Sequence, residues 1–208
     1  MKSSKVLEML ERNQIDRLKA LLQDEIFMES LKTKPDVKKR YAAMKRYLAN
    51  ISSAREILQK PCEVEYKGIK YNAFCNSYSL ALTVEPCGEI EMCKEPERYP
   101  PVERLLTNGG ENSGLIRFSR VLAEAKSKGY KYTKNAIYNN DYLMYYGGAY
   151  FRIALIDLTY SIIDDGKEAV VHHTTGSRKS LTVVTDIGIA VIMPVFIDGE
   201  PDGVVVNA

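Results

Sequence analysis

The stretch CEVEYKGIKYNAF, residues 62–74, decides the fold. Two runs rich in alternating and β-favouring residues flank the pair Lys67-Gly68, which is typical of a strand, a tight turn and a second strand. Pro61 stands directly before them and stops the helical pattern of the preceding residues. An antiparallel sheet is therefore expected to begin at this point.

Upstream of Pro61 the apolar residues recur at helical spacing. Residues 4–32 are predicted to form one helix, with Ser3 and Ser4 as caps, and residues 36–59 a second helix after Pro35. Residues 1–60 carry 14 Lys and Arg against 8 Asp and Glu, whereas residues 61–111 carry 5 against 9. The chain is thus expected to have a basic helical arm, residues 1–60, and a body, residues 61–208.

The body is predicted to be mostly strand. Expected strands span 79–84, 89–93, 150–158, 160–163, 168–174, 181–185 and 189–197, with helices at 115–128 and 139–146 and a flexible loop at 107–114. Gly129 and Gly147-Gly148 would close the two helices, and Asp164-Asp165-Gly166 would form a hairpin turn. Helices, strands, helices and strands in that order predict an α+β fold with mostly antiparallel pairing. The strand-rich parts before and after residue 112 look like loosely similar halves.

Bulk properties are those of a globular protein without a membrane span. No run approaches the roughly 18 uninterrupted apolar residues that a span requires, and the first 30 residues lack the apolar core of a signal peptide. Cys62, Cys75, Cys87 and Cys93 form no Cys-x-x-Cys pair, so they are expected to be reduced and partly buried rather than zinc ligands. These features predict a cytoplasmic protein with no cofactor.

The search for catalytic residues favours a protein without catalysis. His172 and His173 are adjacent in a predicted strand, so their side chains point to opposite faces. No nucleophile elbow, phosphate-binding glycine loop or His-Glu-x-x-His motif is present. A metal-dependent nuclease that uses Asp157, Asp164 or His173 is the alternative that this search leaves open.

Two basic segments suggest contact with nucleic acid. Cations neutralise phosphates, and tyrosine rings stack on bases. The candidate nucleic-acid-binding residues are Lys38, Lys39, Arg40, Lys45 and Arg46 in the second helix, and Lys126, Lys128, Tyr130, Lys131, Tyr132 and Lys134 further on. The opposing interpretation is that the first group pairs with the acidic body and that the second is a solvated helix end followed by an edge strand. The net charge of +2 is also modest for a dedicated DNA-binding protein.

Several short motifs resemble the bacterial DNA sliding clamp, the β subunit of DNA polymerase III. Asn139 and Tyr142-Leu143 match the Asn-x-x-Tyr-Leu opening of its last subdomain, and Met193-Pro194 match the Met-Pro pair at its closing strand. The segment 73–82 is similar to its strand, turn and Arg-Leu-Ala segment, although Ser79 stands where Arg is usual. Residues 99–106 are similar to its Tyr-Pro segment. The resemblance covers about residues 62–197.

The resemblance implies a non-catalytic accessory protein of DNA replication or repair. It also implies an apolar pocket for short linear motifs near the closing strand, with Val191, Met193, Pro194 and Val195 as its candidates. A clamp ring needs several such domains, and this chain has room for about one, so closure would require a homo-oligomer of many copies. The other expectation is a phage or mobile-element inhibitor or adaptor, which binds a host protein or nucleoprotein complex through the basic arm.

Overall fold

The chain folds around two β-sheets of unequal size. The computed structural model describes residues 14–32, 34–51, 53–106, 110–176 and 178–208. In this part of the chain, seven strands form one antiparallel sheet and three form a second sheet in the order β10-β5-β6. The large sheet runs in the order β1 (Cys62–Tyr66), β2 (Ile69–Cys75), β3 (Ser79–Thr83), β9 (Gly188–Ile192), β8 (Leu181–Thr185), β7 (Ala169–His173) and β4 (Asn112–Ile116). The predicted α+β class with a strand-rich, mostly antiparallel body is confirmed.

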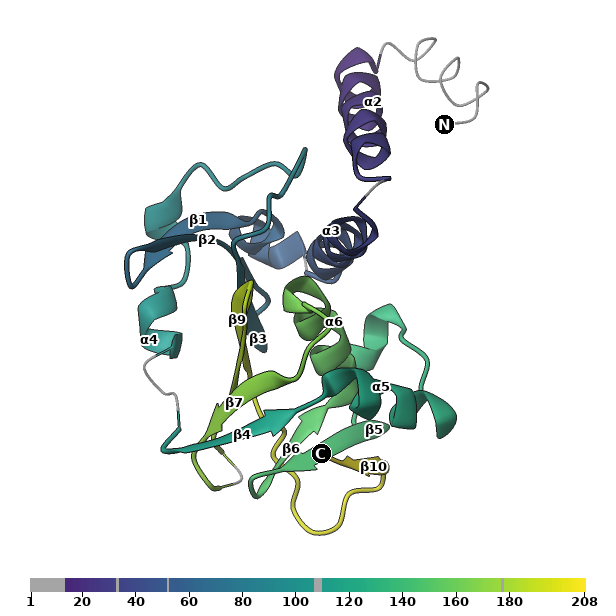
Figure 1. Cartoon of the computed structure of the whole chain (residues 1–208), viewed down its shortest axis with the longest axis vertical. Helices are drawn as coiled ribbons and strands as arrows, with labels where there is room; N and C mark the ends of the chain where they lie inside the picture. The colour runs from purple at the N-terminus through teal and green to yellow at the C-terminus, as the bar shows by residue number, and fades with distance from the viewer. Residues whose placement is uncertain (1–13, 33, 52, 107–109, 177) are drawn as a thin grey trace.

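The centre of the molecule is the helix α6 (Ile153–Ile163), which packs on β3 and β9 of the large sheet (Figure 1). It also contacts the helices α3 (Pro35–Leu48) and α5 (Phe118–Ser127), and the small-sheet strands β5 (Tyr142–Tyr146) and β6 (Ala149–Arg152). Every residue of α6 except Ser161 is buried. A helix that is buried on all sides is apolar all round and shows no amphipathic period. The expected strands at 150–158 and 160–163 are therefore wrong beyond Arg152.

The large sheet and its helices are arranged as two units of the same order. One unit is α3-β1-β2-β3, the other is α6-β7-β8-β9, and each set of three strands is an antiparallel meander. The units meet where β3 pairs with β9 in antiparallel register, Ala81 opposite Ala190, and where α3 packs on α6. The helices of the two units are not placed alike, because α6 packs on β3 and β9 whereas α3 contacts β2. The units lie on either side of residue 112, and the similarity of the two halves of the sequence stays a prediction.

Two tight turns that contain glycine join neighbouring strands; one was predicted as a hairpin and the other as the end of a helix. Lys67 and Gly68 both have positive φ, 52° and 77°, as a type I′ hairpin turn requires, and they join β1 to β2 as predicted. Gly147 and Gly148 also have positive φ, 60° and 81°, and join β5 to β6. The expected helix at 139–146 is wrong, because this Gly-Gly pair is a hairpin turn and does not end a helix.

Other predicted boundaries need correction as well. The expected strand 89–93 is irregular, and the helix expected at 115–128 begins only at Phe118, because residues 112–116 pair with β7 as β4. Asp164-Asp165-Gly166 is a turn, but it follows a helix: Asp164 accepts a hydrogen bond from the Gly166 N–H at 3.0 Å. Gly129 follows α5 with a φ of 99°, as predicted for a helix end.

The helical arm is shorter than expected in its described part. The helix α2 (Ile15–Ser30) extends away from the body in Figure 1, and residues 1–13, with the predicted caps Ser3 and Ser4, lie outside the described residues. The second helix ends at Leu48, and a 3-10 helix, η1 (Ser53–Gln59), follows. The division of the chain at residue 60 stays a prediction, while α3 packs on α6 of the body.

Short elements complete the structure. They are η2 (Pro96–Arg98), α4 (Val102–Leu106), η3 (Lys134–Tyr138) and β10 (Val204–Asn207), and β10 pairs with β5 in parallel. Among the described residues, no helix is both long enough and apolar enough to cross a membrane.

The burial of α6 predicts a large effect of shortening its side chains. Leu158 has no exposed surface, so Leu158→Ala should lower the free energy of unfolding by about 2–5 kcal/mol. Leu115→Ala is the matched control, since Leu115 on β4 is 66% exposed and its replacement should change stability by less than about 0.5 kcal/mol. Urea denaturation measures both, and equal effects would contradict the central place of α6.

Candidate functional site

An apolar pocket of about 200 Å³ lies on the large sheet where β3 begins and β9 ends. The directly paired residues Leu80 of β3 and Val191 of β9 contribute to its floor. They face away from α6, because the side chain of the neighbouring Ser79 points to that helix and accepts a 2.7 Å hydrogen bond from the Thr159 hydroxyl. The lining residues are Cys75, Ser77, Ser79, Leu80, Pro100, Leu105, Val191 and Met193.

One wall of the pocket comes from the segment around α4. Pro100 and Leu105 line the pocket from this segment. Tyr99 fixes the segment to the sheet: its ring is buried, and its hydroxyl donates a 2.9 Å hydrogen bond to the Ala73 carbonyl of β2. Burial raises the pKa of Tyr99, so the hydroxyl keeps its proton and remains a donor.

One exposed apolar side chain lies at the edge of the pocket. Met193 is 43% exposed and lines the pocket, and its N–H donates a 2.9 Å hydrogen bond to the Tyr78 carbonyl. Tyr78 makes an edge-to-face contact with Tyr138, with ring centroids 6.0 Å apart, but neither ring lines the pocket. Met193 is therefore the exposed side chain through which a partner would reach the pocket.

Ser79 connects the pocket to the core. Its carbonyl accepts a 2.8 Å hydrogen bond from Tyr47 of α3, and its hydroxyl bonds with Thr159 of α6 and Asn76. The position at which the clamp resemblance expects Arg is thus buried between two helices, and a small hydroxyl fits there. Substitutions at Ser79 would disturb the core as well as the pocket.

The pocket includes two of the four predicted partner-binding residues. Val191 and Met193 line it. Pro194 is not among the lining residues, and Val195 is buried, with its N–H donating to the Tyr150 carbonyl of β6 at 2.8 Å. Leu80, Pro100 and Leu105 were not predicted as site residues, although they lie in the segments 73–82 and 99–106 that carry the clamp resemblance.

The two predicted nucleic-acid-binding arginines are used inside the protein. Arg40 is buried and contacts the Glu85 carboxylate at 2.7 Å and the Asp164 carbonyl at 3.1 Å. Arg46 donates to the carbonyl and carboxylate of Asp157, at 3.0 and 3.3 Å, and its guanidinium lies 4.6 Å from the centre of the Tyr132 ring. Both residues attach α3 to the body.

The other residues of the predicted nucleic-acid set fall into two groups. Lys39, Lys45 and Lys128 pair with Asp164, Asp24 and Glu124, and Tyr130 is buried with its hydroxyl 3.1 Å from Asp157. Lys38, Lys126, Lys131 and Lys134 are exposed. The lysine and tyrosine residues of segment 126–134 therefore do not form one continuous stacking surface.

The candidate catalytic groups are not brought together. Asp157 contacts Arg46 and Tyr130, Asp164 contacts Lys39, and His173 packs against the Tyr146 ring at 4.8 Å. Within the described ranges, no group of three His, Cys, Asp or Glu side chains could hold a metal ion. These positions therefore assemble no metal site from described residues.

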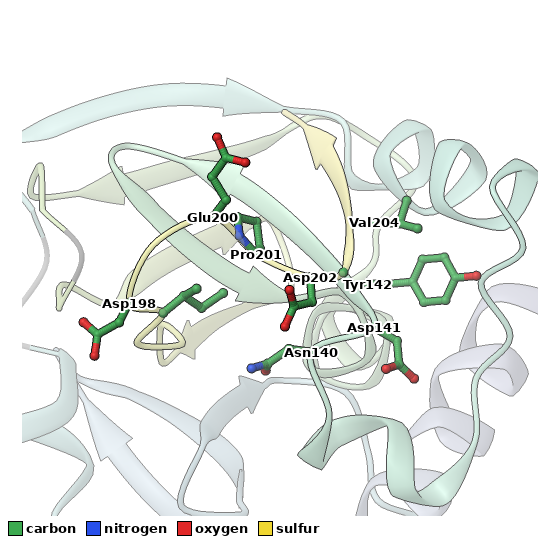
Figure 2. Close-up of a pocket in the computed structure, with 10 residues that line it drawn as sticks. Asn140, Asp141, Tyr142, Asp198, Glu200, Pro201, Asp202 and Val204 are labelled. Atoms are coloured by element: carbon green, nitrogen blue, oxygen red, sulfur yellow. The ribbon is translucent and has the colours of Figure 1, made fainter.

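A larger hollow of about 610 Å³ lies beside the small sheet and is lined by Asp141, Asp198, Glu200 and Asp202 together with less polar neighbours (Figure 2). In Figure 2 the Asp198 and Glu200 side chains point in different directions instead of toward one centre. This hollow is an acidic surface without converging ligands, and it would repel a phosphate backbone.

No protein-family model, curated protein or solved structure matches the chain. The clamp resemblance therefore stays a prediction that rests on the short motifs of this sequence.

The contacts of Arg40 predict a role in stability. Arg40→Ala would leave the Glu85 carboxylate, whose side chain is 15% exposed, without its cation, and should lower the free energy of unfolding by about 3–5 kcal/mol. Lys38→Ala, on the exposed side of the same helix, should change it by less than about 0.5 kcal/mol. Chemical denaturation of both variants tests the difference. Equal stabilities would mean that the Arg40 contacts do not hold α3 in place.

Acid should also weaken the attachment of α3 to the body, because Lys39 of this helix pairs with the Asp164 carboxylate. Burial alone would raise the pKa of this carboxyl, but hydrogen bonds from Lys39 and from the Gly166 N–H outweigh burial and hold the pKa below its ordinary value of 3.8. A lowered folded-state pKa stabilises the protein above the unfolded value, and the stabilisation is lost as pH falls through the folded-state value. Asp164→Asn should therefore lose less stability below about pH 4 than the parent protein, whereas Asp198→Asn in an exposed loop should follow the parent curve.

Proposed function

We propose that this chain is a non-catalytic, clamp-like accessory protein that binds a short apolar segment of a replication or repair protein in the pocket between β3, β9 and α4. One observation carries the proposal. Three segments with clamp resemblance, residues 73–82, 99–106 and 189–195, are separate in the sequence, and each contributes lining residues to the same pocket. Their meeting at one apolar site supports the resemblance.

The size and chemistry of the pocket favour side chains of a peptide as its occupant. Sites for whole small molecules measure roughly 300–1,000 Å³, and this pocket of about 200 Å³ is smaller. Its aliphatic lining by Leu80, Leu105 and Val191 suits one or two apolar side chains. The exposed side chain of Met193 would cover the neighbouring part of the same peptide, as Met does at binding surfaces.

The alternatives have less support from the contacts. A nuclease needs converging carboxylates or histidines, and the predicted ones are engaged separately. An inhibitor or adaptor that binds through the basic helix would have to break the pairs of Arg40 and Arg46 with Glu85 and Asp157. Direct contact with nucleic acid would depend on the exposed lysines Lys38, Lys126, Lys131 and Lys134, and ring closure around a duplex would depend on self-association.

Peptide binding tests the proposal directly. The probes are fluorescent peptides that reproduce the clamp-binding segments of bacterial replicative polymerases and repair proteins, with a scrambled peptide beside each. Fluorescence anisotropy should show saturable binding of at least one native peptide. Met193→Glu places a charge at the exposed end of the pocket and should weaken that binding at least about tenfold, or about 1.4 kcal/mol, because the apolar contact of Met193 is lost and a carboxylate would have to be desolvated.

Leu115→Glu is the matched control, because Leu115 is an exposed apolar residue on β4, three strands away from β9. It should bind the peptide as the parent protein does. Absence of binding by every native peptide, or equal loss in both variants, would overturn the proposal. Light scattering and DNA binding at low salt, measured on the same samples, report separately on self-association and on nucleic acid.

A further inference from the structure

The four cysteines of the chain are all free thiols, but their surroundings differ. Cys62, Cys75 and Cys87 are buried, whereas Cys93 is partly exposed. Burial raises the pKa of the Cys87 thiol to about 12 and also raises the pKa of Cys75, so these two thiols stay protonated and inaccessible. Reaction with a dissolved oxidant would therefore begin at Cys93.

Cys93 lies beside Cys62. The Cys93 N–H donates a 2.8 Å hydrogen bond to the carbonyl of Pro61, the residue directly before Cys62. Cys62 is the next residue along the chain, and the Cys93 side chain is near enough to contribute to the raised pKa of the Cys62 thiol. Disulfides join cysteines whose Cα atoms are about 4.4–6.8 Å apart. The backbone bond and the side-chain interaction together place the two thiols next to each other.

Charged side chains of both signs surround the exposed thiol. Cys93 lines an open pocket of about 240 Å³ together with Lys60, Lys94 and Arg98, and with the carboxylates Glu56 and Glu95. Lys60 also pairs with Glu91, and Arg98 pairs with Glu95. The pocket is therefore polar and open to solvent, so that a charged, dissolved oxidant can reach the Cys93 sulfur.

We propose that Cys62 and Cys93 are a redox-reactive pair, which glutathione disulfide converts into an intramolecular disulfide. The Cys93 thiolate attacks one sulfur of glutathione disulfide, so that a Cys93–glutathione bond forms, the glutathione S–S bond breaks, and one glutathione thiolate leaves with a proton from water. The Cys62 thiol then loses its proton, and its sulfur attacks the Cys93 sulfur and releases the second glutathione. Two protein thiols are oxidised, and one glutathione disulfide is reduced to two glutathione molecules.

Cys62 should control the speed of the second step. Burial, followed by the proximity of Cys93, raises the pKa of the Cys62 thiol to about 11. Only a small fraction is thiolate at neutral pH, and that fraction grows about tenfold for each pH unit below this value. The adduct at Cys93 should therefore accumulate first and resolve faster at higher pH.

The disulfide would also fasten the segment that carries one wall of the apolar pocket. Cys93 is followed by η2, by the anchoring Tyr99 and by the pocket residue Pro100. In the reduced protein, described contacts such as the Cys93 backbone bond and the Lys60–Glu91 pair hold its first part to β1. An effect of oxidation on peptide affinity rests on the proposed function, whereas formation of the disulfide does not.

The test is incubation of the full chain with glutathione disulfide, followed by intact mass measurement and non-reducing peptide mapping. The parent protein should become two hydrogen atoms lighter, with one crosslinked peptide pair that contains Cys62 and Cys93. Cys62→Ser should stop at the adduct, so its mass should rise by one glutathione. Cys93→Ser, at the more exposed position, should gain neither the crosslink nor an adduct under the same conditions.

Cys87→Ser is the matched control and should form the same crosslink as the parent protein. Circular dichroism identifies any variant that does not fold. If a cysteine variant does not fold, the proposal is decided on the parent protein, by peptide mapping of its crosslink and by the pH dependence with which the glutathione adduct is converted into the disulfide. A parent protein that keeps its mass, that stops at the adduct, or that links other cysteines would overturn the proposal. These masses are independent of peptide binding, so failure of the peptide experiment leaves the disulfide result interpretable.

Discussion

The structure depends on the burial of α6 on every side. This helix lies against β3 and β9, between α3, α5 and the small sheet, and only Ser161 among its residues is not buried. Its few polar side chains therefore form hydrogen bonds inside the protein. Asp157 binds Arg46 and Tyr130, and Thr159 binds Ser79, because a buried polar group without a partner would cost free energy. These bonds fix α3 and the start of β3 relative to the helix.

The same burial explains the main failures of sequence interpretation. The residues 153–163 lack an amphipathic period, and a continuous apolar run of this kind does not distinguish a buried helix from a buried strand. The predicted phosphate-binding role of α3 stays a prediction, but the contacts of its arginines could not be read from the sequence. Arg40 and Arg46 look like a basic surface in the sequence, but their partners Glu85 and Asp157 are more than 40 residues away and are brought close only by the fold. The residues that neighbour an arginine in the sequence do not indicate such a distant partner.

Where local chemistry decides the conformation, the sequence was informative. Lys67-Gly68 required positive φ at two residues, and the hairpin of β1 and β2 formed around it. The Gly147-Gly148 pair has the same positive φ at both residues in the hairpin of β5 and β6, although the sequence was interpreted as a helix at 139–146 that this pair would end. At the pocket, Val191 and Met193 were named through the clamp resemblance, and their role as binding residues stays a prediction. Leu80 and Leu105 required knowledge of which strands are neighbours.

The two faces of the β3–β9 pair explain why the pocket lies where it does. The face toward α6 is closely packed: an added Cβ at Gly188 would lie 2.2 Å from the Leu82 carbonyl oxygen and 2.5 Å from the Ile163 side chain. On the opposite face the segment 99–106, which follows β3 in the chain and precedes β4, leaves an apolar space lined by Pro100 and Leu105. The pocket is therefore made by a connection between the two units, and the contacts that hold this connection on the sheet also control access to the pocket.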